Sequence, residues 1–362
     1  MHATTKSNLA ASPAVTLAVD LAKDVFELAF ADGSGRIIER KRLKRGQFAS
    51  CLDNHSELRV VMEACGSAHY WARRFARSGH SVTLLPAQYV RPYVRRNKTD
   101  RADAAALLEA DRCGDIRPVP VKTPEQQGIQ GLHRIREHHK AERTAAINLV
   151  RGLLREFGIV IPAGAEKVRP AVLAALEDGD NELPMALRHA LAAVLDQISA
   201  CQDAMAAIEK QLAEFAKRDT RSQRLMAASG IGLITATALS ASMGEFSRFP
   251  SGRHFASALG LTPREYSSGS TRRLGRITKR GDVYLRALLI HGARSALVAA
   301  KVAHKKGQPL DRTQRWAFDL AERVGHNKAA VALANKTARR LWAAEHHGAA
   351  FDPDHLSQRC TA

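Results

Sequence analysis

The chain has 362 residues, of which 45% are hydrophobic, and its 55 Lys and Arg residues outnumber its 36 Asp and Glu residues, giving a formal net charge of +19. A chain of this length can bury more than one core, so we expect two or three domains, and the positive charge favours polyanionic partners. Five scattered cysteines exclude a disulfide framework, and no run of about 20 apolar residues predicts a membrane span, so we expect a cytoplasmic protein without membrane contact.

Residues 14–118 carry the pattern of an α/β domain, after a polar stretch (1–13) that is typical of a disordered tail. Apolar runs joined by tight turns predict consecutive strands over 15–20, 25–30 and from residue 37 onward. Two further strands are predicted over 58–62 and 80–86, on either side of a helix over 68–77. Three strands in a row, followed by alternating strands and helices, resemble a ribonuclease-H-like fold.

Four carboxylates stand where such a domain would bring them together. Asp20 and Glu63 each end a predicted strand, and Asp100 and Asp103 lie in an alanine-rich stretch with strong helix propensity. A spacing of three residues puts Asp100 and Asp103 on one helix face. Carboxylate oxygens suit hard cations such as Mg²⁺, and two such ions can assist phosphodiester cleavage. For Asp100 and Asp103 alone, a solvated acidic helix start is equally good, but the four together favour a metal site.

Residues 119–220 are predicted to be a helical middle region. Its second half contains an unbroken heptad seam of about four repeats. The seam comprises Leu187, Leu191, Val194, Ile198, Cys201, Met205, Ile208, Leu212 and Phe215. A coiled coil between two chains is the preferred interpretation, and packing on a neighbouring helix of the same chain is the alternative.

Residues 221–345 hold most of the excess charge, with 22 Lys and Arg against 7 Asp and Glu. The stretch 228–236 resembles the turn of a helix-hairpin-helix element, in which Gly230 and Gly232 would let backbone N–H groups approach a phosphate. A plain packing turn between two helices is as good an interpretation of so short a pattern. Residues 346–362 are predicted to be a tail.

A Ser/Gly/Arg loop at 264–273 follows this turn. A hydroxyl in such a loop serves either as a nucleophile or as a backbone contact, and spacing alone leaves both open. Basic residues in and around the loop and the acidic helix are candidate phosphate ligands, namely Lys98, Arg264, Arg272, Arg273, Arg276, Lys279 and Arg280.

These motifs together resemble the DEDD transposases of the insertion-sequence-110 family. The resemblance rests on the four acids, the string Asn97-Lys98-Thr99-Asp100, the turn 229–232 and the stretches 260–263 and 268–270. The segment 327–336 is similar to the 1111 subgroup. In order, the motifs cover the chain from residue 15 to about residue 344.

The resemblance implies a fold and a reaction. It implies an N-terminal RuvC-like domain, a helical coiled-coil segment and a mainly helical C-terminal transposase domain, in a bacterial protein that acts on the nucleoid. It further implies a homo-oligomer, a dimer or a tetramer, that recombines donor and target DNA guided by a structured noncoding RNA of its element. By position, Asp20, Glu63, Asp100 and Asp103 match the Mg²⁺- or Mn²⁺-binding tetrad, and Ser268 matches the nucleophilic serine, which would form a phosphoserine link to DNA.

Two other functions fit part of the pattern. A metal-dependent Holliday-junction resolvase or nuclease would keep the acids and use water in place of Ser268. A nucleic-acid-binding protein without activity would use the acids only as helix caps and surface charge. The four placed acids and the serine loop favour the recombinase.

Overall fold

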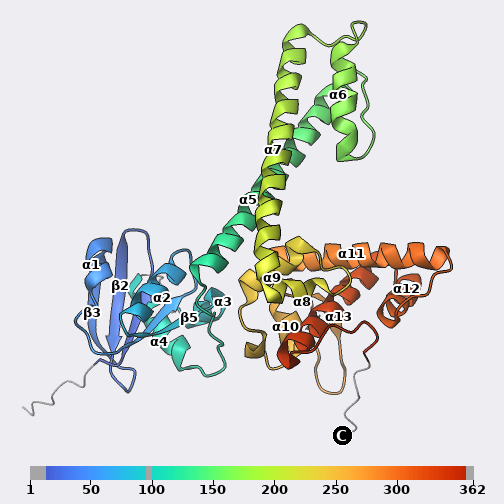
Figure 1. The fold of residues 1–362 in the computed structure, drawn as a ribbon. Helices are drawn as coiled ribbons and strands as arrows, with labels where there is room; N and C mark the ends of the chain where they lie inside the picture. Colours follow the sequence, from blue (N-terminus) through green and yellow to red (C-terminus); the bar gives the residue numbers. More distant parts are fainter. Residues whose placement is uncertain (1–13, 95–99, 356–362) are drawn as a thin grey trace, which may run out of the picture. The chain divides into compact units, whose positions relative to one another are not determined.

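The structure is a computed structural model that describes residues 14–94 and 100–355, with side chains from residue 102 in the second range (Figure 1). The predicted tail 1–13 and the candidate phosphate ligand Lys98 therefore lie outside the described residues. The chain divides into two compact units, Met1–Thr123 and Pro124–Ala362.

The first unit is built on a five-stranded sheet. Its strands are β1 (Thr16–Asp20), β2 (Val25–Ala31), β3 (Ile37–Lys44), β4 (Arg59–Glu63) and β5 (Ser81–Leu85). They lie in the order β3-β2-β1-β4-β5. The first three strands are antiparallel, whereas β4 runs parallel to both β1 and β5. The predicted succession of a meander followed by alternating strands and helices is therefore confirmed.

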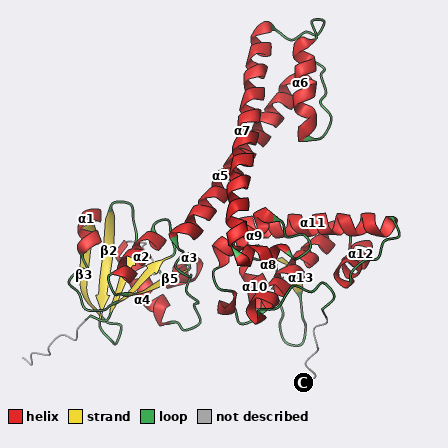
Figure 2. Cartoon of the chain, viewed as in Figure 1, coloured by secondary structure: helices red, strands yellow, loops and turns green. Residues whose placement is uncertain are grey.

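Helices cover both faces of this sheet (Figure 2). Side chains of a strand alternate between the two faces, so Leu17 and Val19 pack toward Trp71 of α2 (Ala68–Arg77), whereas Ala18 packs toward Leu107 of α4 (Asp100–Arg112). The short helix α1 (Arg45–Ser50) adds to the α2 layer, and α3 (Ala87–Val90) with the 3₁₀ turn η1 (Arg91–Tyr93) adds to the α4 layer.

The second unit is mainly helical. Two long helices, α5 (Pro124–Glu156) and α7 (Met185–Arg218), form an arm together with η2 (Ala165–Lys167) and α6 (Val168–Glu177). The remaining elements form a body with its own core. They are α8 (Thr220–Met226), α9 (Leu233–Met243), η3 (Phe246–Arg248), α10 (Gly252–Ala258), β6 (Pro263–Glu265), β7 (Leu274–Ile277), α11 (Val283–Lys305), α12 (Arg312–Val324) and α13 (His326–His347).

The heptad seam of α7 packs within the chain. Leu191 and Ile198 share a core with Val150 and Leu154 of α5, and Leu212 shares another with Ile129. These side chains are buried without a second chain, so they are not available for a coiled coil between chains. The preferred interpretation of the seam is therefore corrected to the intramolecular alternative, because both arrangements require the same apolar spacing.

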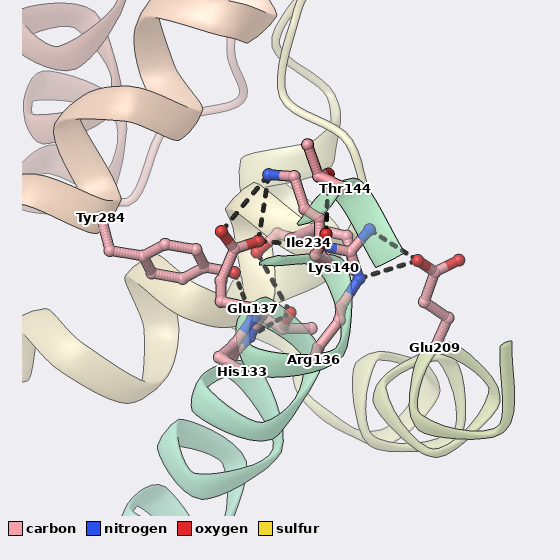
Figure 3. A network of polar contacts seen from close by, with 9 residues as sticks. His133, Arg136, Glu137, Lys140, Thr144, Glu209, Ile234 and Tyr284 are labelled. Carbon is pink, nitrogen blue, oxygen red and sulfur yellow. Dashed lines mark hydrogen bonds and ion pairs between the residues drawn. The ribbon is translucent and has the colours of Figure 1, made fainter. Parts of the chain in front are cut away.

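A polar network fixes the arm to the body (Figure 3). His133 of α5 is buried, and its Nδ1 and Nε2 lie 3.0 Å from Tyr284 Oη of α11 and from Thr237 Oγ1 of α9. The Thr237 hydroxyl donates to the Leu233 carbonyl, so it accepts from the Nε2–H of His133, and Nδ1 accepts from Tyr284. Beside it, Arg136 pairs with Glu209 of α7 at 2.6 Å. The neutral imidazole of His133 thus joins α5 to α9 and α11.

Helix α11 is unusually long and apolar. Among the described helices, it is the one whose length and composition would allow it to cross a membrane. Within this fold it is a core helix, because Leu285, Leu289 and Leu297 are buried in the body. Its length and apolar character are accounted for by that packing.

The described part of the predicted C-terminal tail, residues 346–355, packs on the body. Helix α13 continues to His347, and the segment after it turns back toward α12. The Thr313 hydroxyl donates to the Pro353 carbonyl, and Arg340 donates to the carbonyls of Asp352 and Pro353. This stretch therefore belongs to the C-terminal body.

Acid should weaken the attachment of the arm through His133. Burial, with a smaller contribution from Arg136, lowers the pKa of His133 to about 4. In the unfolded chain the imidazole binds a proton near pH 6.5, whereas in the folded protein it stays neutral until about pH 4. The free energy of unfolding is therefore unaffected above pH 6.5 and decreases as the pH falls toward 4, by about 3 kcal/mol in all. In urea unfolding, the stability difference between wild type and His133→Gln should shrink from pH 7 to pH 4.5. His189→Gln, at an exposed position of α7, should leave the pH dependence unaltered. Parallel curves for wild type and His133→Gln would contradict this role.

Candidate active site

Two acidic side chains meet at one edge of the first unit's sheet. Asp20 is the last residue of β1, and Glu63 is the last residue of β4. The two strands pair in parallel, with Val19 opposite Met62, so Asp20 and Glu63 follow in register at the same sheet edge. Since neighbouring side chains alternate, both acids project toward the α4 face.

Helix α4 brings a third carboxylate to this edge. Ala104, Leu107 and Leu108 hold the helix on the sheet, and the same helix presents Asp103 to a cavity of about 630 Å³. Asp20 and Glu63 line that cavity too. Asp100 begins α4 one turn earlier, and its side chain lies outside the described residues. The structure thus brings together the three predicted acids whose side chains it describes.

The Cys65 thiol, which also lines this cavity, responds to two of the acids. Burial raises the pKa of the Cys65 thiol, and the carboxylates of Glu63 and Asp20 raise it further. Arg91 of η1 also lines this cavity. Three oxygen-donor side chains form the kind of site that a hard divalent cation prefers, and a nearby guanidinium can bind a phosphate.

The predicted serine loop is the tip of a β-hairpin in the second unit. Strands β6 and β7 pair antiparallel, and Ser268 and Thr271 exchange two backbone hydrogen bonds of 3.2 and 3.1 Å beyond them. Gly269, at the turn, has φ +54°, which favours glycine. Ser268 is exposed, and within the described residues its hydroxyl has no hydrogen-bond partner. A hydroxyl placed this way is accessible to a large substrate.

The neighbouring Ser267 is used by the hairpin itself. Its hydroxyl donates to Glu265 Oε1 at 2.7 Å and accepts from the Arg273 backbone N–H at 3.2 Å. Arg272 donates to the same Glu265 oxygen at 3.3 Å. The two adjacent serines are therefore distinguished by geometry, because one hydroxyl is engaged across the strands and the other is not.

The base of the hairpin is held by a close backbone contact and a buried arginine. A Cβ on Gly281 would lie 1.8 Å from the Ala258 carbonyl oxygen, so only glycine allows these segments to meet. Arg286 of α11 is buried and donates to the carbonyls of Leu259 and Arg280, at 3.2 and 3.3 Å. The hairpin thus has a fixed base and an exposed tip.

The predicted basic ligands occupy this hairpin and its base. Arg264, Arg272, Arg273, Arg276, Lys279 and Arg280 are all exposed. Among the described residues, Arg272 is the one of these six with an ion pair, to Glu265. The other five have exposed side chains without an ion pair in the described residues, and their contact with phosphates stays a prediction.

The glycine turn between α8 and α9 has a packing role. Gly230 has φ +84°, and its backbone meets that of Gly292 in α11, where a Cβ would lie 1.9 Å from the Gly230 carbonyl oxygen. Gly232 caps α9 without a side-chain hydrogen bond, and both turn glycines line a cavity of about 760 Å³. Gly230 is therefore accounted for by helix packing, and phosphate binding by this turn stays a prediction.

Sequence reasoning missed three residues of these sites, Arg91, Cys65 and Arg286. Arg91 sits in a basic and aromatic stretch, Val90-Arg91-Pro92-Tyr93, which is a weak signal without the fold. The signal for Arg286 is stronger, because it is a charged residue among leucines on the buried face of α11.

In a comparison with known proteins, the region of the acidic cavity and the region of the serine hairpin both match transposases. Residues 222–308 match the profile of the transposase IS116/IS110/IS902 family, and residues 17–159 match a second profile, described as a transposase. The chain is 43% identical to a probable family 20 transposase of Pseudomonas aeruginosa, over 90% of this chain and 95% of that protein. It is 40% identical to the transposase for insertion sequence element IS1111A of Coxiella burnetii, over 90% and 88%. It is 35% identical to the transposase for insertion sequence element IS1328 of Yersinia enterocolitica, over 94% and 99%.

Cys65 should report on the acidic cavity in solution. Glu63→Gln removes a negative charge that raises the pKa of this thiol, so the thiolate fraction and the rate of alkylation by iodoacetamide at pH 8 should increase. Peptide mass spectrometry separates Cys65 from the other cysteines. Asp111→Asn on α4, where Asp111 pairs with Arg59, makes the same change of charge outside the cavity and should leave the rate unaltered. Equal rates in wild type and Glu63→Gln would contradict the described geometry.

Proposed function

The chain belongs to the IS116/IS110/IS902 family of transposases, and on that premise we propose that it excises and inserts an insertion sequence by RNA-guided, site-specific DNA recombination. The observation that carries the DNA-cleaving part of the proposal is the cavity lined by Asp20, Glu63 and Asp103. Phosphodiester cleavage is assisted by divalent cations, and clustered carboxylates are the side chains that bind them.

The fold supports this assignment. A sheet of order β3-β2-β1-β4-β5, with a meander on one side and parallel strands on the other, fits a ribonuclease-H-like domain of the RuvC type over residues 14–118. Residues 119–220 would then form the helical linker, and residues 221–345 the transposase domain that carries Ser268.

The acidic cavity fits Mg²⁺ or Mn²⁺ because its donors are carboxylate oxygens. Asp20, Glu63 and Asp103 would hold the ion, and Asp100, which shares a face of α4 with Asp103 by spacing, would complete the tetrad. When bound, such an ion neutralises charge on the phosphate and lowers the pKa of a ligated hydroxyl. Arg91, which lines the same cavity, would bind a phosphate oxygen.

We assign the nucleophile to Ser268. Its Oγ would attack the phosphorus, so that an Oγ–P bond forms while the bond between phosphorus and one bridging oxygen of the DNA breaks. The hydroxyl proton passes to a base, and the departing oxygen takes a proton to become a free DNA hydroxyl. Attack by a second DNA hydroxyl on the phosphoserine reverses these steps and rejoins the strand.

The guide RNA and the oligomer rest on the family resemblance. Sequence choice would come from base pairing, while the basic residues of the protein contact the sugar-phosphate backbone. The seam of α7 is buried within the chain, so a dimer or tetramer would have to use other surfaces.

A second function is favoured by one observation. The three carboxylates belong to the first unit alone, and a metal-dependent junction resolvase or nuclease could use them with water as the nucleophile. Such an enzyme would cleave DNA without forming a covalent link to the protein.

Metal binding should depend on Glu63. Binding of Mn²⁺, followed by electron paramagnetic resonance, should be at least about tenfold weaker in Glu63→Gln, since a ligand is lost. Glu109→Gln, at an exposed position of α4 where Glu109 faces Arg112, removes the same charge and should bind as the wild type does. Equal weakening in both variants would show that Mn²⁺ responds only to net charge.

Covalent capture tests the nucleophile. Wild-type protein with donor and target DNA, the element's flanking RNA and Mg²⁺ should give a covalent protein–DNA band on a denaturing gel. Ser268→Ala and Asp103→Asn should abolish it, because one lacks the attacking oxygen and the other a metal ligand. Ser267→Ala, which removes only hydrogen bonds within the hairpin, should retain the adduct at a rate lower by about tenfold, the effect of roughly 1.4 kcal/mol.

Each result separates the candidate functions. Cleavage without an adduct, lost in Asp103→Asn and kept in Ser268→Ala, would establish the nuclease. An adduct that survives Ser268→Ala and disappears in Ser267→Ala would move the nucleophile to position 267. An adduct that forms equally well without RNA would remove the guide from the proposal.

A further inference from the structure

A broad groove lies in the second unit beside the base of the serine hairpin. It has a volume of about 970 Å³ and is walled by the N-terminus of α10, by α12, by α13 and by the base of the β6–β7 hairpin. These helices meet closely, since a Cβ on Gly252 of α10 would lie 2.8 Å from the Arg339 carbonyl oxygen of α13. The groove is therefore a fixed feature of the packed body.

The charge of this groove has one sign. Six basic side chains line it, and none of the residues that line it is Asp or Glu. The six are Arg253, Arg312, Lys328, Lys336, Arg339 and Arg340. Arg340 is already bonded to the carbonyls of Asp352 and Pro353. In the described part of the chain, the side chains of the other five form no ion pair.

Arg340 has the counter-charges of Asp352, Asp311 and Asp354, whereas the charged neighbours that act on Lys336 are all cations. Lys336 lies with its Nζ 4.1 Å from the centre of the Trp316 ring, which is a favourable cation–π contact. Burial lowers the pKa of Lys336, and Arg340, Arg312 and Arg339 lower it further. A polyanion in the groove would remove this mutual repulsion, and it would release bound counterions as it entered.

The groove is continuous with the hairpin that carries Ser268. Pro263 and Ile277, which pair at the start of β6 and the end of β7, form part of its wall. Asn335 of α13 donates to the Leu261 carbonyl at 3.1 Å, so the groove floor and the hairpin base are joined. Ser268 lies five residue steps along the chain from Pro263, which places the tip within roughly 17 Å of the groove.

We propose that this groove binds the phosphate backbone of the DNA strand that Ser268 attacks, and thereby positions the scissile phosphate at the hairpin tip. The inference rests on the proposed function in taking Ser268 as the nucleophile. DNA is the occupant that the continuity with the hairpin favours, because a strand leaving the groove along β6 and β7 leads to the reacting hydroxyl. The contacts are to phosphates and carry no base preference.

The test removes two exposed cations from the groove. Lys328→Gln with Arg339→Gln should weaken binding of a fluorescent DNA oligonucleotide by at least about tenfold at 0.1 M NaCl, and should reduce the slope of log Kd against log [NaCl] by nearly 2, about 1 for each lost phosphate contact. Arg315→Gln with Arg323→Gln, two exposed positions of α12 that do not line the groove, removes equal charge and should leave the slope as in the wild type.

A second readout reports on the groove directly. Two of the three tryptophans of the chain, Trp316 and Trp342, line it, so titration with DNA should change the tryptophan emission of the wild type and change it much less in the Lys328/Arg339 double variant. Thermal unfolding of each variant confirms that the fold is retained.

The outcomes separate this inference from the proposed function. Wild-type slope and affinity in the Lys328/Arg339 variant would overturn the groove, whatever the fate of the covalent adduct. A variant that loses affinity for an RNA oligonucleotide of the same length but keeps its DNA slope would overturn DNA as the occupant. The predicted loss of DNA binding, combined with absence of any adduct in the wild type, would keep the groove as a DNA site and remove Ser268 as the nucleophile.

Discussion

The in-register parallel pairing of β1 with β4 is the constraint on which the acidic cavity depends. Asp20 and Glu63 are far apart in sequence, and they become neighbours because both end strands that stop at the same edge. A slip of one residue would turn Glu63 to the opposite face, where Trp71 and Phe75 pack. The buried apolar residues that precede each acid therefore fix the site, since they hold the register against such a slip.

The serine hairpin solves a different physical problem, that of presenting a side chain to a large substrate from a fixed base. Backbone contact at Gly281 and the buried Arg286 hold the two ends, while the tip beyond β6 and β7 is exposed. Among the described residues no carboxylate pairs with this buried arginine, and its guanidinium is satisfied because it donates to two carbonyls. Arg286 therefore acts on the tip only by fixing its base.

The sequence predicts most of this organisation where local pattern and fold agree. The strands, helix α2 and the placement of Asp20, Glu63 and Asp103 follow from apolar runs and helix spacing. The partner of the α7 seam cannot be predicted in this way, because the same heptad spacing suits packing on a helix of the same chain or of another chain. The groove on α12 and α13 is likewise invisible in sequence, since Arg312 and Lys328 become neighbours only through helix packing. Nor does spacing alone distinguish Ser267 from Ser268, because the difference lies in the hydrogen bond that the Ser267 hydroxyl donates to Glu265.

That hydrogen bond also limits how Ser268 could be activated. Glu265 is the acidic residue nearest to it on β6, and its carboxylate already accepts from Ser267 and Arg272, contacts that lower its pKa. A carboxylate with a lowered pKa is a weak proton acceptor, and within the described hairpin there is no other acid or imidazole. If Ser268 attacks as proposed, its proton would go to a group outside the hairpin, such as the substrate phosphate. In the proposed function, a hairpin without a proton acceptor of its own would therefore depend on the bound substrate for its reactivity.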